Sequence, residues 1–212
     1  MLSVVIPAHN EETELPRTLT ALRGALEAQD EPWEVVVVDD DTCDRTAALA
    51  REAGATVVAV RCRQIAAARN AGARAAAGEM LLFVDADTRV SPAVVAGAVR
   101  ALRDGAAGGG ARVEFEPPIP IWARVYLAIF MLFWTPLGYA AGCFLFARRD
   151  AFDAVRGFDE AYYASEEIWL SRALRETGRF VVLRDAVRTS GRKVRMNGAI
   201  GILFTSARLL AG

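Results

Sequence analysis

The first half of the chain alternates short, wholly apolar runs with longer segments that have a helical pattern of apolar positions. Uninterrupted apolar runs bounded by polar residues are typical of strands that are buried on both faces of a sheet. Four such strands are predicted, over residues 2–6, 34–38, 56–60 and 80–84.

Helix signals occupy the segments between these strands. One helix is expected after Asn10. A second is expected to have Asp44 as its N-cap and Gly54 at its end, because these residue types favour the two ends of a helix. The alanine-rich stretch 64–77 predicts a third helix, closed by Gly78.

Strands that alternate with helices build a mostly parallel central sheet with helices on both faces, so the predicted fold class is α/β. A further helix begins at Pro92 with Ser91 as its N-cap. After the glycine-rich stretch 105–110 the alternation ends, and a strand near 112–115 leads into a mixed α/β tail. Because no polar linker long enough to separate two domains is present, a single domain over 1–212 is predicted.

The apolar segment 125–147 raises the question of a membrane. It has 23 residues and no charge, which is close to the length of a membrane-spanning helix. Pro136 and Gly138 interrupt it midway. We therefore favour a buried or membrane-surface helix that ends near Trp134, followed by a turn and a buried strand over 143–147. Peripheral membrane contact through this segment is compatible with that interpretation.

Composition and charge exclude several classes of protein. Lys and Arg number 25 against 26 Asp and Glu, so the basic excess of a nucleic-acid-binding protein is missing. Cys43, Cys62 and Cys143 form no C-x-x-C pair, so neither a disulfide framework nor a zinc site is expected. The first residues favour a strand over a signal peptide, and a reducing, cytoplasmic location is predicted. With His9 as the one histidine, any metal must be held by oxygen ligands.

Acidic residues gather directly after three of the predicted strands, in 7–12, 39–41 and 85–88. The carboxyl ends of parallel strands meet at one edge of a sheet, where ligands bind in open α/β folds. Asp85 and Asp87 can both reach Mg²⁺ or Mn²⁺, which can bridge the phosphate oxygens of a substrate. A solvated turn or a helix cap explains most isolated D-x-D pairs, but the apolar run MLLFV before Asp85 favours the metal site.

Three motifs in this order, VVIPAHNEE, EVVVVDDDTCDRT and AAARNAGARAAAGEMLLFVDADT, resemble the nucleotide-sugar-binding half of the family 2 glycosyltransferases, which have the GT-A fold. The resemblance continues through CFLFARRDAFDAVRGFDE and SEEIWLSRALRETGRF. It implies a GT-A-like Rossmann-type sandwich. It also implies a nucleotide-sugar-binding half, an acceptor-side half and a C-terminal helix, over 1–115, 116–195 and 196–212.

The resemblance implies an inverting glycosyltransferase that moves a sugar from a nucleoside-diphosphate sugar to an acceptor hydroxyl and depends on Mg²⁺ or Mn²⁺. Asp85 and Asp87 match the family's D-x-D motif, where the cation neutralises the diphosphate. The residues that it places in the nucleotide-sugar pocket are Pro7, His9, Glu11, Asp39, Asp40, Arg69, Asp85, Ala86 and Arg192. Arg69 pairs either with an acidic motif or the substrate, or in a surface ion pair. Arg192 is alternatively part of a solvated basic turn, and His9 a simple pocket wall.

The acceptor side needs a general base, a carboxylate that takes the proton of the attacking hydroxyl. The family supplies it from an E-D pair, and here the matching residues are Glu166 and Glu167. Because adjacent helical residues diverge by about 100°, one of the two faces the cleft, and Glu167 is expected to be the base. The acceptor is not specified, although the apolar segment 125–147 fits a lipid-linked acceptor at the cytoplasmic face of a membrane.

Two other functions fit part of the sequence. LLFVDADT also resembles the D-x-D-x-T motif of Mg²⁺-dependent phosphatases of the haloacid-dehalogenase type, in which the first aspartate is a nucleophile. Those enzymes also need a downstream lysine, for which Lys193 is the one candidate, and the motifs at Pro7 and Asp39 would go unexplained. A non-catalytic nucleotide-binding GT-A domain is the second alternative, because the E-E pair departs from the family pattern.

Overall fold

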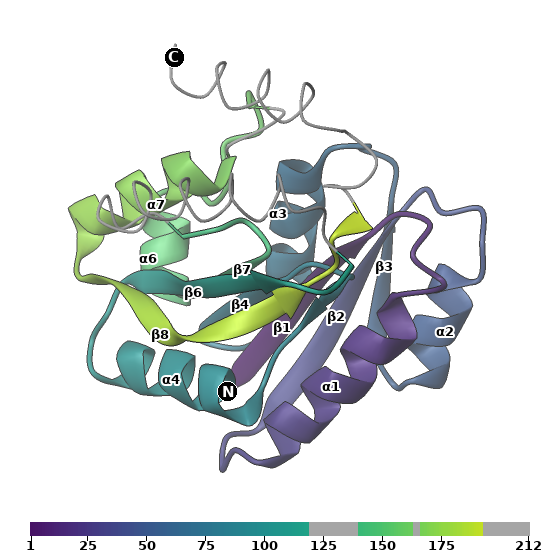
Figure 1. Ribbon diagram of the computed structural model, residues 1–212. Helices are drawn as coiled ribbons and strands as arrows, with labels where there is room; N and C mark the ends of the chain where they lie inside the picture. Colours follow the sequence, from purple (N-terminus) through teal and green to yellow (C-terminus); the bar gives the residue numbers. More distant parts are fainter. Residues whose placement is uncertain (119–139, 163–165, 193–212) are drawn as a thin grey trace.

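The computed structural model describes residues 1–118, 140–162 and 166–192. Its strands form one sheet in the order β3-β2-β1-β4-β7-β6-β8-β5 (Figure 1). The strands are β1 (Leu2–Ala8), β2 (Trp33–Asp40), β3 (Thr56–Val60), β4 (Met80–Val84), β5 (Thr88–Arg89), β6 (Gly108–Phe115), β7 (Phe144–Arg148) and β8 (Phe180–Thr189). The helices are α1 (Leu15–Glu27), α2 (Thr46–Glu52), α3 (Ile65–Ala75), α4 (Pro92–Arg103), α6 (Arg149–Ala154) and α7 (Glu166–Thr177).

The sheet is mostly parallel, as predicted. β3, β2, β1 and β4 run parallel, β7 lies antiparallel between β4 and β6, and β8 is parallel to β6. β3 and β4 have the predicted bounds, whereas β1 and β2 continue beyond their predicted ends. The pairs Pro7–Val38 and Ala8–Asp39 extend the ladder there. Several candidate site residues therefore belong to the sheet itself.

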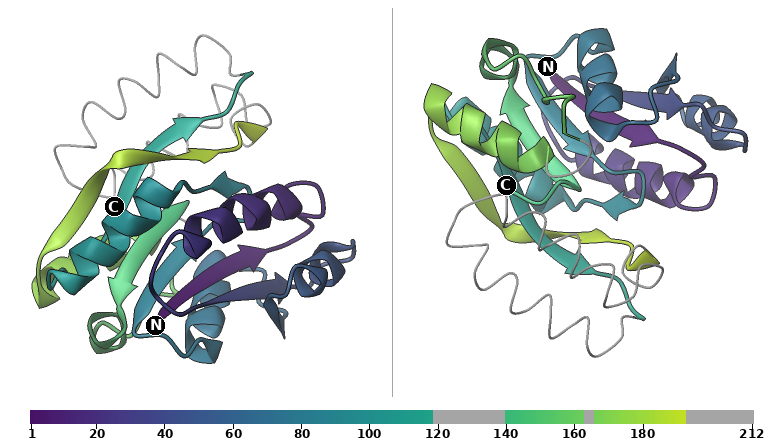
Figure 2. Two further views of the ribbon diagram at one scale, coloured as in Figure 1. Left: turned by 90° about the horizontal axis from the view of Figure 1, so that it is seen from below. Right: turned by 90° about the horizontal axis from the view of Figure 1, so that it is seen from above.

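Helices cover both faces of this sheet, which confirms the predicted layers (Figure 2). On one face α1, α2 and α4 pack against strand side chains such as Val4 and Leu82. On the other face α3, α6 and α7 pack against Val5, Leu81 and Phe83. Successive side chains of a strand point to opposite faces, so strands covered on both sides are apolar throughout. This double burial explains the apolar runs of the first half.

Two predicted helix ends are wrong by a few residues. The N-cap of α2 is Arg45 rather than Asp44, which stands one position earlier and accepts the backbone N–H of Thr46 at 2.9 Å. α3 ends before Gly78, which therefore does not close it. Gly78 lies instead against β1, where a Cβ atom would come within 2.4 Å of Ser3 Oγ. A close approach between segments, rather than a helix end, requires glycine there.

Other boundaries agree better with the sequence. Ser91 caps α4 as predicted and accepts the backbone N–H of Val94 at 3.3 Å. The strand predicted near 112–115 begins earlier, at Gly108, because the glycine run is part of β6. The predicted strand over 143–147 is β7, which begins one residue later at Phe144.

The remaining predicted elements lie outside the described residues. These are the first part of the apolar segment, 125–139, and the C-terminal helix over 196–212. Within 1–118, 140–162 and 166–192, no helix has the length and apolar character that crossing a membrane requires.

Candidate active site

A cavity of about 230 Å³ lies at the carboxyl ends of β1, β2 and β4. Its lining includes most of the residues predicted to bind the donor or the metal, namely Pro7, His9, Glu11, Asp40, Asp85, Ala86 and Asp87. Residues at and before the start of α3 complete it: Arg63, Gln64, Ile65 and Ala68, together with Ala8. Asp39, Arg69 and Arg192 do not line this cavity. The strand ends thus gather the predicted acids at one edge of the sheet, as the parallel order requires.

Arg69, on α3, is buried beside this cavity, with 1% of its surface exposed. Its guanidinium donates hydrogen bonds to Asp85 Oδ1 at 2.7 Å, to Glu166 Oε1 at 2.7 Å and to the carbonyl oxygen of Gly142 at 2.6 Å. The Phe158 ring centre lies 5.2 Å from its guanidinium carbon. The alternative of a surface ion pair for Arg69 is therefore wrong. It pairs with the first acid of the D-x-D motif and the first acid of the E-E pair.

The two glutamates at the start of α7 have different surroundings. Glu166 is 4% exposed, and its carboxylate is bound by Arg69. Glu167 lies against Gly142, where a Cβ atom would be 3.5 Å from its Oε2. Burial, followed by the negative charge of Glu166, raises the pKa of Glu167 to about 7 against the opposing charge of Arg69. Its carboxyl group therefore gains and loses a proton near neutral pH.

The two acids of the D-x-D motif have different partners. Asp85 accepts a hydrogen bond from Arg69 through Oδ1. Asp87, which is 5% exposed, lies near the end of β8, where Thr189 Oγ1 is 3.5 Å from its Oδ1. The backbone N–H of Ser190 donates to the carbonyl oxygen of Asp87 at 3.1 Å. Over 1–118, 140–162 and 166–192, no three His, Cys, Asp or Glu side chains gather closely enough to hold a metal ion.

Asp39 and Asp40, at the end of β2, both bind backbone N–H groups. Asp40 Oδ1 accepts from Cys62 at 2.8 Å and from Arg63 at 2.9 Å, so this buried carboxylate holds the loop between β3 and α3. Asp39 Oδ1 accepts from Thr42 at 3.1 Å and so closes a turn. Asp40 therefore shapes the cavity wall, whereas Asp39 orders the turn that follows β2.

His9 is oriented by contacts with two neighbours. Its Nδ1 lies 2.7 Å from the carbonyl oxygen of Asp40, which can only accept, so Nδ1 carries the hydrogen. Its Nε2 lies 3.2 Å from the Nδ2 of Asn10, whose Oδ1 accepts the backbone N–H of Cys43. Nε2 is then the acceptor. These contacts fix the orientation of the imidazole ring, which forms part of the cavity wall.

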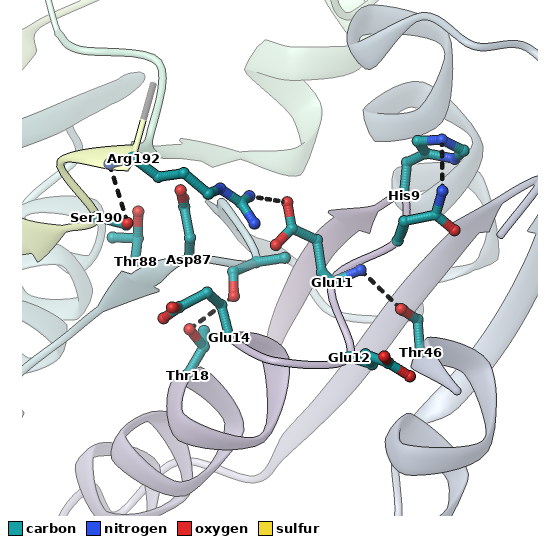
Figure 3. A network of polar contacts seen from close by, with 12 residues as sticks. His9, Glu11, Glu12, Glu14, Thr18, Thr46, Asp87, Thr88, Ser190 and Arg192 are labelled. Atoms are coloured by element: carbon teal, nitrogen blue, oxygen red, sulfur yellow. Dashed lines mark hydrogen bonds and ion pairs between the residues drawn. The ribbon is translucent and has the colours of Figure 1, made fainter. Parts of the chain in front are cut away.

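The last described residue, Arg192, lies over the loop that follows β1. Its guanidinium donates to Glu11 Oε1 at 2.5 Å, and Figure 3 shows it reaching across to Glu11 with Asp87 beside it. The hydrogen bond to Glu11 raises the pKa of Arg192. The backbone N–H of Glu11 in turn donates to Thr46 Oγ1 at 2.8 Å. Arg192 is thus bonded at the cavity rim and does not belong to a freely solvated turn. Arg195, three residues later in the sequence, lies outside the described residues.

Sequence reasoning missed two residues that assemble the site. Gly142 supplies the carbonyl oxygen that Arg69 binds. Asn70, next to Arg69, bonds both backbone groups of Phe158: its Nδ2 donates to the carbonyl at 2.8 Å, and its Oδ1 accepts the N–H at 2.9 Å. Asn70 thereby ties the segment before α7 to α3. A polar pair inside an alanine-rich helix was the available signal, because buried polar groups need partners.

Comparisons with known proteins identify the family to which this chain belongs. The family model for glycosyl transferase family 2 matches residues 3–156. An undecaprenyl-phosphate 4-deoxy-4-formamido-L-arabinose transferase of Pectobacterium carotovorum is 34% identical over 98 residues, which cover 43% of this chain and 30% of that protein. A dolichol-phosphate mannosyltransferase of Pyrococcus furiosus is 29% identical over 109 residues, which cover 49% of this chain and 30% of that protein. The matched stretch therefore spans under a third of these relatives.

Solved structures share the fold. The crystal structure of S. aureus TarS 1-349 has a TM-score of 0.64 and 21% identity, and the match covers 90% of this chain and 60% of that chain. The mannosyltransferase PcManGT from Pyrobaculum calidifontis, in complex with GDP-Man and Mn²⁺, has a TM-score of 0.68 and 20% identity, over 88% of this chain and 56% of that one. The described sheet and its helices are therefore of the GT-A type.

Proposed function

This chain belongs to glycosyl transferase family 2, and from this premise we propose that it transfers a sugar from a nucleoside-diphosphate sugar to a hydroxyl group of an acceptor. The position of Arg69 carries the proposal. Its guanidinium binds Asp85, at the edge of the cavity, and Glu166, at the start of α7, each at 2.7 Å. An acid of the proposed donor side and an acid of the proposed acceptor side are thus held next to each other, which suits a reaction between two substrates. The family match leaves the phosphatase alternative without support.

The nucleotide is proposed to bind in the cavity at the strand ends, between Pro7, His9 and Ala86. Asp39 or Asp40 is proposed to bind the base or the ribose. Glu11 and Arg192 form the rim, and Arg192 can exchange the carboxylate of Glu11 for the diphosphate, because both are oxyanions that a guanidinium binds. This exchange would bring a positive charge to the leaving group.

The acids of the cavity fit Mg²⁺ or Mn²⁺, since such ions need one or two protein carboxylates beside phosphate oxygens and water. Asp87 is the proposed ligand. Asp85 accepts from Arg69 through Oδ1 at 2.7 Å, so its other carboxylate oxygen is available as a second ligand. When bound, the ion neutralises charge on the diphosphate and makes it a better leaving group.

Glu167 is the proposed general base. The acceptor hydroxyl attacks the anomeric carbon and gives its proton to the carboxylate of Glu167, while the bond from that carbon to the diphosphate oxygen breaks. This single displacement inverts the anomeric configuration. The pKa of about 7 suits the role, because a base works best near the operating pH. Glu166 is proposed to hold Arg69 rather than to take the proton.

The acceptor is proposed to be lipid-linked and to be reached at the cytoplasmic face of a membrane. The names of the relatives, which refer to undecaprenyl phosphate and dolichol phosphate, support this proposal, as does the uncharged segment 125–147. We also propose that donor half 1–115 and acceptor half 116–195 form one domain. Support comes from the single sheet, in which β4 pairs with β7 and β6 pairs with β8.

The test is a thermal-shift panel of UDP, GDP, dTDP and their sugars, with and without Mn²⁺, because ligands stabilise the folded state that binds them. A Mn²⁺-dependent shift for one nucleotide is expected, together with transfer or hydrolysis of its sugar. Proton NMR of the first product then gives the anomeric configuration. A folded protein that no nucleotide stabilises contradicts the proposal. Binding without any turnover identifies the non-catalytic alternative.

A further inference from the structure

Three carboxylates, those of Asp85, Glu166 and Glu167, act on the single positive charge of Arg69. Asp85 and Glu166 bind it directly. We propose that Arg69 is a positioning residue for the transfer: by holding Asp85, Glu166 and Gly142 together, it leaves Glu167 as the carboxylate that takes the acceptor's proton. This inference rests on the proposed function and adds the residue that decides which acid serves as the base.

The arrangement needs the planar fork of an arginine. Nη1 donates to Glu166, and Nη2 donates both to Asp85 and to the carbonyl oxygen of Gly142. A guanidinium presents its N–H groups in a fixed plane, so these acceptors are held in a fixed relation to one another. A lysine ammonium is a single point and cannot reproduce this spacing. With 1% of Arg69 exposed and the Phe158 ring beside it, the group is also held inside the protein.

Arg69 acts on Glu167 through two neighbours. The loop at Gly142 is bound through its carbonyl, and the same residue faces Glu167, whose Cδ would be 3.4 Å from a Cβ at that position. Glu166 is anchored in the first turn of α7, and the next helical residue points about 100° away from it. Anchoring Glu166 on Arg69 therefore fixes the direction of Glu167, which lies against the Gly142 loop.

The charge of Arg69 has a measurable effect on the pKa of Glu167. Among the described residues, three charged groups have the largest effects on Glu167: Glu166 on α7, Arg69 on α3 and Asp85 after β4. Glu166 and Asp85 raise the pKa of Glu167, whereas Arg69 lowers it. Removing Arg69 should therefore shift the acidic limb of the pH profile to higher pH, which loss of packing alone would not do.

The experiment compares Arg69→Lys, Arg69→Gln and the double variant Arg69→Gln/Glu166→Gln with the wild type. For the single variants, kcat is expected to fall about 10²-fold through misplacement of the base, while donor affinity changes about threefold at most. The acidic limb should move upward in Arg69→Gln and return toward the wild type in the double variant, which removes both charges. The double variant leaves no unpaired carboxylate at Glu166, so it is expected to fold even if Arg69→Gln alone does not. Its kcat then tests the loss of Arg69.

Arg149→Gln is the matched control. Arg149 donates to the carbonyls of Ala73, Ala76 and Gly78 near the carboxyl end of α3, and has no hydrogen bond to Asp85, Glu166 or Glu167. It should lower stability and leave the pH profile unchanged. An unshifted profile in Arg69→Gln, or a loss confined to donor affinity, overturns the inference.

A readout without turnover separates this inference from the proposed function. The stability difference between wild type and Glu167→Gln depends on pH through the titration of Glu167. The same difference is measured again in the Arg69→Gln background. If the wild type transfers no sugar, the proposed function fails, yet the midpoint of this difference must still move upward when Arg69 is lost. An unmoved midpoint overturns the positioning role independently of activity.

Discussion

Replacing Glu167 by glutamine tests both its surroundings and its proposed role. Its pKa is raised from 4.5 to about 7 in the folded protein, chiefly by burial. At about 1.4 kcal/mol for each pKa unit, ionising Glu167 costs the folded state about 3 kcal/mol. Because the folded-state pKa is the higher one, this cost is absent below pH 4.5, grows as the pH rises, and is complete above pH 7.

Glu167→Gln is therefore expected to gain stability relative to the wild type as the pH rises, while its turnover falls about 10²-fold or more from loss of the base. Urea unfolding between pH 4.5 and pH 7 and above measures the first effect. Steady-state kinetics with donor in excess measure the second. A stability difference that is the same at every pH refutes the raised pKa, and an unchanged kcat refutes the assignment of the base.

The neighbouring residue supplies the control with the opposite sign. Glu166 is 4% exposed and bound to Arg69, so Glu166→Gln breaks a buried ion pair. Such a loss costs about 1–3 kcal/mol, because one hydrogen bond to a buried charge is removed while Arg69 keeps its bond to Asp85. Two substitutions of the same kind, one residue apart, are thus expected to change the free energy of unfolding at neutral pH in opposite directions.

Four further substitutions test other parts of the structure. Asp87→Asn should abolish the Mn²⁺ dependence of nucleotide-induced thermal shifts in a folded protein, and a retained dependence would remove Asp87 from the metal site. Arg192→Gln should weaken donor binding about tenfold in calorimetric titration, since a charged hydrogen-bond partner of the diphosphate is lost, and unchanged affinity would leave it only its bond to Glu11. Gly109→Ala should abolish cooperative unfolding, because its Cβ would lie 2.0 Å from the carbonyl oxygen of Val181. Gly24→Ala, with open space around it, should stabilise α1 by about 0.5–1 kcal/mol.

Local patterns were sufficient for most of the first half of the fold. β3 and β4 have the bounds that their apolar runs predicted, and Ser91 caps α4 because its hydroxyl reaches the Val94 N–H within one turn. Acids placed directly after parallel strands must meet at one edge, so Asp40, Asp85 and Asp87 line one cavity. Strand burial and helix capping depend on residues that are close in the chain, so both can be predicted from a single sequence.

The second half and the contacts between halves depended on packing over long distances. Gly78 was expected to end a helix, yet it is needed where that segment meets Ser3 on β1. The alternatives for Arg69 were equal in the sequence, because burial of a side chain is decided by elements that are far away in the chain. Its partners Asp85 and Glu166 lie 16 and 97 residues from it.

The sequence by itself determined the order of strands and helices of the first half, the family, and the set of acids from which a site could be built. The tertiary structure alone decided how those acids divide: Asp85 and Glu166 bind one buried guanidinium, and Glu167 lies against Gly142 with a raised pKa. The physical reason is that hydrophobic periodicity is local, whereas the pairing and desolvation of a charge depend on every segment that packs around it.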